Sequence, residues 1–70
     1  MCDFEAIGKN IVRLRSERKL SQEDLCGMVE MDRSYLSEIE NGHKNFSIGI
    51  LFRIAKALDV KPEDILKTGK

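Results

Sequence analysis

The chain has 70 residues, which is enough for one domain with a small hydrophobic core. Two cysteines and one histidine are too few for a disulfide framework or a zinc site of usual spacing, so stability must come from well-packed helices or a partner subunit. The formal net charge is zero, but residues 20–40 hold six acidic side chains and one basic one, whereas the flanking segments are basic. This balance excludes strong non-specific binding to nucleic acid.

We expect a single domain over residues 1–70. The sequence contains neither a signal peptide nor an apolar run long enough to span a membrane, which favours a cytoplasmic protein. Cys26 lies within an apolar pattern and is expected to be a small core residue, whereas Cys2 lies at the expected frayed terminus.

Five segments have apolar residues at the three- and four-residue spacing of a helix. The first is residues 4–19, whose predicted inner stripe is Phe4, Ile7, Ile11 and Leu14. The second is residues 21–29, where Ser21 is a good N-cap and Asp24 stands at the capping-box position that often holds Glu. The predicted inner face of this second helix is Leu25, Met28 and Val29.

The third predicted helix covers residues 32–41, with Asp32 as its N-cap and Asn41-Gly42 as a left-handed stop. It follows the second helix after a tight turn at residues 30–31. The positions where these two helices must touch are small or apolar, namely Leu25, Cys26, Val29, Leu36 and Ile39. This pattern is typical of a helix-turn-helix, whose second helix enters the major groove of DNA.

The fourth predicted helix covers residues 47–58, and a short fifth helix covers residues 62–67 with Pro62 in its first turn. The predicted core stripe of the fourth helix is Ile48, Leu51, Ile54 and Leu58. Five helices with short connections predict a compact all-α domain.

The sequence resembles the XRE-type helix-turn-helix family, which includes the lambda-type phage repressors and Cro. The resemblance rests on Ile11…Leu14-Arg15, Leu20-Ser21-Gln22-Glu23-Asp24-Leu25-Cys26, Leu36…Ile39-Glu40-Asn41-Gly42 and Ser47…Leu51…Ile54-Ala55…Ala57-Leu58. It covers nearly the whole chain and implies a five-helix, lambda repressor-like fold that binds DNA. The sequence offers no nucleophile–base pair, metal cluster or Gly-rich phosphate loop, so neither catalysis nor a cofactor is expected.

Within that family, the segment Asp32-Arg33-Ser34-Tyr35-Leu36-Ser37…Ile39-Glu40, followed by Asn45-Phe46-Ser47, is similar to the controller proteins of restriction–modification systems. The chain departs from their pattern at Ser34, Glu38 and Lys44. The resemblance implies a transcriptional regulator. The alternatives left open are an antitoxin-like or general autorepressor and an adaptor of the same fold that does not bind DNA.

The predicted DNA contacts are Gln22, Arg33, Ser34, Tyr35, Ser37, Lys44 and Asn45. The family resemblance implies a phosphate contact for Gln22, and a helix N-terminus is a natural phosphate site. Arg33 at the start of the recognition helix can bridge guanine O6 and N7. Glu38 can accept from cytosine N4 or repel phosphates, so it is not assigned as a base reader.

Two further roles follow from the resemblance. Arg15 and Glu40 match positions that form a buried salt bridge in the family, so they are expected to tie the first helix to the third. The family binds palindromic DNA as a two-fold dimer, and the surplus apolar residues predict an interface formed by Phe46, Ile50, Phe52, Val60 and Ile65. An activator of this kind would also contact RNA polymerase through an exposed acidic or polar patch.

Overall fold

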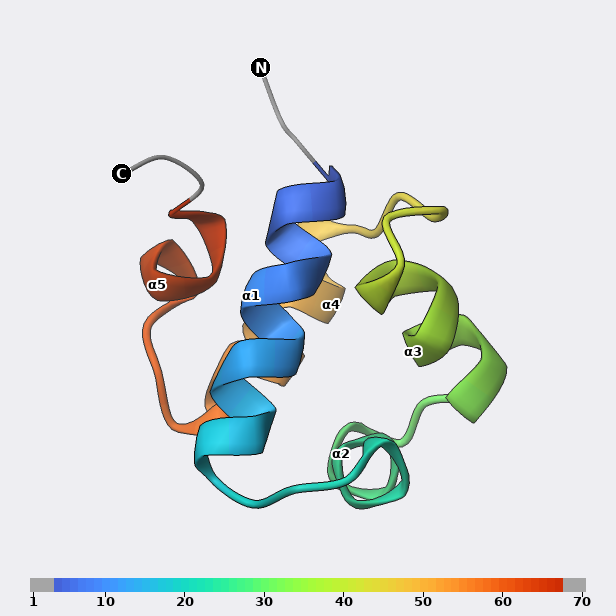
Figure 1. The fold of residues 1–70 in the computed structure, drawn as a ribbon, viewed down its shortest axis with the longest axis vertical. Helices are drawn as coiled ribbons and strands as arrows, with labels where there is room; N and C mark the ends of the chain where they lie inside the picture. Colours follow the sequence, from blue (N-terminus) through green and yellow to red (C-terminus); the bar gives the residue numbers. More distant parts are fainter. Residues whose placement is uncertain (1–3, 68–70) are drawn as a thin grey trace.

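A computed structural model describes residues 4–67 of the chain, so Cys2 lies outside the described residues. The helices are α1 (Phe4–Glu17), α2 (Gln22–Val29), α3 (Arg33–Glu40), α4 (Ile48–Leu58) and α5 (Pro62–Leu66) (Figure 1). The predicted all-α fold is therefore confirmed. None of the helices in this part of the chain is both long enough and apolar enough to span a lipid bilayer.

The helix boundaries differ from the predicted ones by one or two residues. Ser21, Asp32 and Ser47 have extended backbone angles, so each is an N-cap and the helix begins one residue later. At the other end of α1, Lys19 has a φ of 59°, and this left-handed residue follows a helix that ends at Glu17.

Hydrogen bonds between residues close together in the sequence, and a positive φ angle, fix the helix ends. Ser21 Oγ accepts from the backbone N–H of Asp24 at 3.0 Å, and Asp24 Oδ2 accepts from the backbone N–H of Ser21 at 2.9 Å, which confirms the capping box. That backbone hydrogen bond lowers the pKa of the Asp24 carboxyl. Asp32 occupies the N-cap of α3 but its side chain makes no capping hydrogen bond. Gly42 has a φ of 77°, as the predicted left-handed stop requires.

The helices enclose one hydrophobic core. Helix α1 packs against α3 and α5, α2 packs against α3 and α4, and α4 also packs against α5. Figure 1 shows α1 crossing the middle of the molecule, between α5 on one side and α3 on the other. The buried hydrophobic residues are Ile7, Ile11, Leu14, Leu25, Cys26, Val29, Leu36, Ile39, Leu51, Ile54, Ala55, Leu58 and Ile65.

The burial of three side chains differs from the prediction. Met28 is 53% exposed and Ile48 is 64% exposed, although helical spacing predicts both on inner faces. Ile48 is the first residue of α4, where it lines an apolar hollow that remains open to solvent. In contrast, Ile65 is fully buried because α5 packs against both α1 and α4, which removes Ile65 from the predicted dimer interface.

The contact between α1 and α3 depends on a glycine. A Cβ at Gly8 would lie 2.6 Å from the carbonyl oxygen of Ile39, and it would lie closer still to that of Glu40. The backbones of the two helices therefore approach so closely at Gly8 that a Cβ there would force them apart. This close approach positions the end of α3, and with it Glu40, against α1.

Candidate nucleic-acid interface

A buried ion pair connects α1 to the end of α3. Arg15 Nε donates to Glu40 Oε2 at 2.7 Å, and Arg15 Nη2 donates to Glu40 Oε1 at 3.1 Å. The expected Arg15–Glu40 salt bridge is therefore present, with side chains that are 16% and 4% exposed. The hydrogen bond to Glu40 raises the pKa of Arg15, so the guanidinium stays charged.

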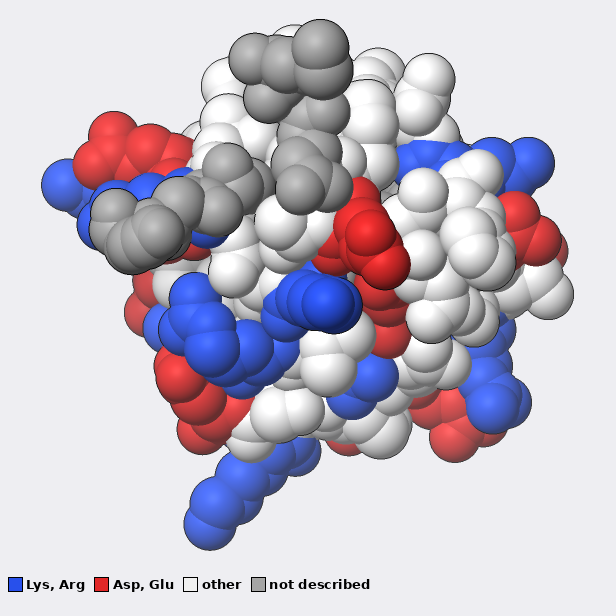
Figure 2. Space-filling view, turned by 45° about the horizontal axis from the view of Figure 1, so that its top comes forward, with Lys and Arg blue, Asp and Glu red and all other residues white. Residues whose placement is uncertain are grey.

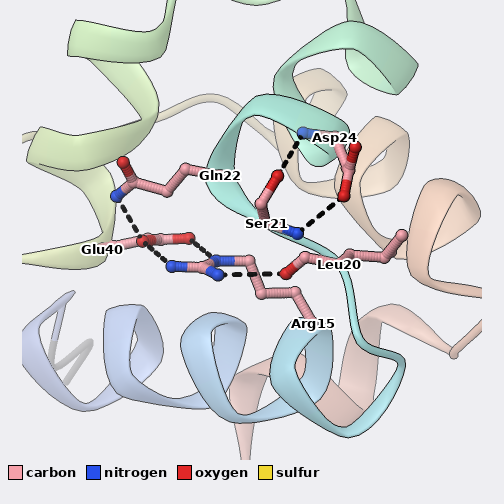
Figure 3. A network of polar contacts seen from close by, with 6 residues as sticks. All are labelled: Arg15, Leu20, Ser21, Gln22, Asp24 and Glu40. Carbon is pink, nitrogen blue, oxygen red and sulfur yellow. Dashed lines mark hydrogen bonds and ion pairs between the residues drawn. The ribbon is translucent and has the colours of Figure 1, made fainter.

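Two more hydrogen bonds extend this pair into the turn before α2 (Figure 3). Arg15 Nη1 donates to the carbonyl oxygen of Leu20 at 3.1 Å, and Gln22 Nε2 donates to Glu40 Oε1 at 2.8 Å. The Glu40 carboxylate thus accepts three hydrogen bonds, which offset the cost of its burial. One carboxylate at the end of α3 orients residues from α1 and from the first turn of α2.

Gln22 is consequently held by the protein and is not a freely solvated side chain. It is the first residue of α2, and its Nε2 carries a second hydrogen that the bond to Glu40 does not use. The backbone N–H groups in the first turn of a helix also lack intrahelical partners. The position remains compatible with the predicted phosphate contact.

The other predicted contact residues lie around α3. Arg33 and Ser34 at its start are exposed, whereas Ser37 is half-buried. Together with Gln22 and Glu38 they line an open hollow of about 490 Å³. The fold therefore brings together the start of α2 and the outward face of α3, as a helix-turn-helix requires.

A second hollow, of about 240 Å³, adjoins the first. It is lined by Asp32, Ser34, Tyr35, Glu38 and Lys44, so Ser34 and Glu38 belong to both hollows. Tyr35 is half-buried against the core, and its hydroxyl donates to the carbonyl oxygen of Asn45 at 3.4 Å. This long hydrogen bond connects α3 to the loop after it.

The charged groups on this surface have no ion-pair partner within residues 4–67. This holds for Arg33, Glu38 and Lys44, whereas the exposed pair Arg13–Glu17 forms at 3.3 Å within α1. Figure 2 draws the side of the molecule on which α1 lies in front, and there too basic and acidic side chains are intermixed and do not form one basic stripe. The charge pattern thus favours a few specific contacts over broad electrostatic attraction.

One residue without a predicted role lies among the predicted contacts. Glu38 is exposed and lines both hollows. The signal in the sequence is its spacing of four residues from Ser34, which puts both side chains on one face of the helix.

A different surface carries three of the four large apolar side chains that are exposed among residues 4–67, the fourth being Met28 on α2. Phe52 is 55% exposed, Ile48 is 64% exposed and Leu66 is 40% exposed. Ile48 and Leu66 line an apolar hollow of about 140 Å³, and Phe52 lies one helical turn after Ile48. Of these three residues only Phe52 belongs to the predicted interface. The predicted interface residues Phe46, Ile50 and Val60 are half-buried against the core, and the rings of Phe46 and Phe4 pack edge-to-face with their centroids 5.4 Å apart. We call the three exposed residues, Ile48, Phe52 and Leu66, the apolar face.

Two other site types find no support in the described residues. No group of three or more His, Cys, Asp or Glu side chains between residues 4 and 67 is placed to bind a metal ion. Cys26 is buried, as expected, and burial raises the pKa of its thiol, so it acts as a small core residue and not as a nucleophile.

A helix-turn-helix family model, HTH_3, matches residues 11–65. Control protein C.BamHI from Bacillus amyloliquefaciens is 38% identical over 60 residues, which are 84% of this chain and 74% of that protein. The structure of the restriction-modification controller protein C.AhdI from Aeromonas hydrophila matches with a TM-score of 0.87 and 35% identity, over 90% of this chain and 96% of that one. The controller protein C.Esp1396I, solved as a tetramer with its natural 35 base-pair operator, matches with a TM-score of 0.77 and 32% identity, over 91% of this chain and 95% of that one. The family match spans most of the chain, so the protein belongs to the HTH_3 helix-turn-helix family, and its relatives include restriction–modification controller proteins.

Proposed function

We propose that the chain is a sequence-specific DNA-binding transcriptional regulator of the restriction–modification controller type, acting as a homodimer on a palindromic operator. The observation that carries the proposal is the recognition surface itself. Arg33, Ser34 and Ser37 on α3 share one open hollow with Gln22 at the start of α2. The relatives support the controller type, since one of them was solved on its operator.

Base reading is assigned to the outward face of α3. Arg33 is exposed and has no ion-pair partner within residues 4–67, so its guanidinium can donate two hydrogen bonds to guanine O6 and N7. The hydroxyls of Ser34 and Ser37 can donate to bases or phosphates from the same hollow.

Phosphate binding is assigned to the two ends of this surface. At one end, Gln22 lines the first hollow at the start of α2, where its side chain and the first N–H groups of the helix can bind a phosphate. At the other end, Lys44 and Asn45 lie in the loop after α3, and Lys44 lines the second hollow. These contacts fix the register of α3 on the duplex without reading sequence.

Dimerisation is assigned to the apolar face. A chain of zero net charge gains little from non-specific attraction to DNA, so useful affinity requires two half-sites to be bound at once. Ile48, Phe52 and Leu66 are large apolar side chains left exposed outside the recognition surface, which is typical of a partner surface.

The direct test is binding to DNA. We expect the full chain to bind the duplex upstream of its own gene. Random-site selection should recover a two-fold symmetric sequence whose half-sites are separated by one helical turn of DNA, about 34–36 Å, or by a multiple of it. Failure of both routes to yield a bound sequence at moderate salt would contradict the proposal. Footprints at a restriction or methyltransferase gene would distinguish a controller protein from a general autorepressor.

The dimer has its own test. Phe52→Ser should shift the sedimentation velocity of the free protein toward the monomer and weaken operator binding. Met28→Ser is the matched control, because Met28 is 53% exposed and belongs to α2 instead of the apolar face. Equal effects of the two substitutions on self-association would place the dimer interface elsewhere.

A further inference from the structure

Glu38 is a carboxylate with no partner on the recognition surface. Its side chain is exposed and lines both hollows, and no hydrogen bond or ion pair to it occurs within residues 4–67. The backbone at this position is fixed, because the carbonyl oxygen of Glu38 accepts from the N–H of His43 at 2.9 Å. The structure therefore presents the carboxylate on an ordered turn of α3 without using it internally.

Three other acidic residues of the same segment have an internal role that Glu38 lacks, whereas Glu30 and Asp32 are exposed without a side-chain partner among residues 4–67. Glu40 accepts three hydrogen bonds, and Asp24 completes a capping box. Glu23 lies in the first turn of α2, where the helix dipole favours a negative charge. Glu38 lies in the last turn of α3, where the dipole disfavours it, and no basic residue stands three or four positions away.

A carboxylate in the major groove can be satisfied by only a few groups. It is an acceptor, and both phosphates and the acceptor atoms of guanine repel it. Cytosine presents its N4 amino group as a donor with no acceptor on the same base edge, whereas adenine places N7 beside its N6 amino group. Cytosine is thus the base whose edge suits Glu38 best.

The position of Glu38 on α3 fits a base pair different from the one that Arg33 contacts. Glu38 comes five residues after Arg33, which corresponds to a rise of about 7.5 Å along an α-helix. Successive base pairs are about 3.4 Å apart, so the two ends of the exposed face span more than one step. Arg33 and Glu38 then recognise neighbouring parts of one half-site with opposite hydrogen-bonding chemistry.

We propose that Glu38 is a specificity-determining residue that accepts a hydrogen bond from the N4 amino group of a cytosine in each half-site. This proposal rests on the proposed function, since it concerns the same surface. Its carboxylate also repels sequences without a donor at that position, which raises discrimination at the expense of general affinity.

The test compares base preferences of the wild type, Glu38→Gln and Glu38→Ala by random-site selection and by titration of single-base operator variants. We expect one cytosine in each half-site whose replacement weakens wild-type binding roughly 10-fold or more. Glu38→Ala should lose this preference, and Glu38→Gln should exchange it for adenine, because glutamine pairs with adenine N6 and N7. Both variants should bind unrelated duplex more tightly.

A base analogue tests the contact without changing the protein. When N4-methylcytosine pairs with guanine, its remaining N–H lies in the base pair and its methyl group replaces the donor of the major groove. This substitution at the selected cytosine should weaken the wild type and leave Glu38→Ala unaffected. Glu23→Gln is the matched control, since it removes the same charge outside both hollows; it should not change any base preference.

The outcomes separate this proposal from the proposed function. If the wild type selects a sequence but all Glu38 variants keep its preference at every position, Glu38 only repels DNA and the cytosine contact is overturned. If the wild type selects no sequence, the proposed function fails and the cytosine contact fails with it. Unchanged urea unfolding of each variant shows that altered preferences come from the surface and not from the fold.

Discussion

Glu38 and Glu40 lie two residues apart on α3 and have opposite environments. The Glu40 side chain is 4% exposed and accepts hydrogen bonds from Arg15 and Gln22, whereas Glu38 is exposed without a partner among the described residues. The inward carboxylate of Glu40 connects α3 to α1 through Arg15 and to α2 through Gln22. The outward one leaves its hydrogen-bonding capacity unused. On this short helix, the presence or absence of an internal partner separates residues that stabilise the fold from residues available to DNA.

Removing the inward carboxylate should have the largest effect. In Glu40→Ala the charged Arg15 loses its partner in a mostly buried site, which should lower the free energy of unfolding by about 3–5 kcal/mol. Urea denaturation followed by circular dichroism measures it. Glu17→Ala breaks an exposed pair in α1 and should cost less than about 1 kcal/mol. Similar losses in both variants would mean that the buried pair is no more stabilising than a surface one.

Forcing α1 and α3 apart at Gly8 should have the next largest effect on stability. Gly8→Ala places a Cβ against the carbonyl oxygens at the end of α3 and should destabilise the protein by about 1–3 kcal/mol. Gly27→Ala is the control in α2, since a Cβ there meets nothing within 4 Å. It should stabilise the protein by about 0.5–1 kcal/mol, because glycine is costly inside a helix. Thermal unfolding of the two variants should therefore shift in opposite directions.

Substitution on the outward face should change binding and leave the fold intact. Arg33→Ala should weaken binding to the selected operator by about 1–3 kcal/mol per half-site while the unfolding transition stays within about 0.5 kcal/mol of the wild type. Fluorescence anisotropy and urea denaturation on the same preparation measure both quantities. If Arg33→Ala is unfolded, Arg33 stabilises the fold and its assignment to DNA binding is wrong.

The smallest effect concerns the exposed capping box of α2. The folded pKa of Asp24 lies below its unfolded value, so its ionised form stabilises the fold at pH values above the unfolded pKa of about 3.9. This contribution is lost as the pH falls through the lower folded pKa. The advantage of the wild type over Asp24→Ala in urea denaturation should thus be constant near neutral pH and shrink in that acidic window. An advantage that grows on acidification would contradict the assignment.

Most of the fold is predictable from the sequence because local signals fix it. Two helix starts are marked by side-chain hydrogen bonds to backbone N–H groups nearby, at Ser21 with Asp24 and at Ser47. The end of α3 is marked by the positive φ of Gly42. The buried stripe Ile7, Ile11 and Leu14 follows from helical spacing alone. The Arg15–Glu40 pair was reached through the family resemblance, because 25 residues separate its partners.

The errors share a different origin, namely tertiary contacts that spacing does not encode. Ile48 continues the stripe of α4, but it is the first residue of the helix and no neighbour covers it. Ile65 belongs to a helix of five residues, too short for a periodic pattern to define its inner face. Gly8 carried no prediction, since only the approach of α3 gives it a role. The exposure of Glu38 without an internal partner is likewise a tertiary property, and its contact with a base stays a prediction.

The bond between Gln22 and Glu40 has a consequence for the thermodynamics of binding. A glutamine side chain that is ordered in the free protein has already lost much of its rotamer entropy during folding. Contact with a phosphate then requires little further ordering at this position, so the complex is favoured by preorganisation. The exposed Arg33 must instead be immobilised when the operator is bound, which makes the two contacts unequal in entropy although both belong to one interface.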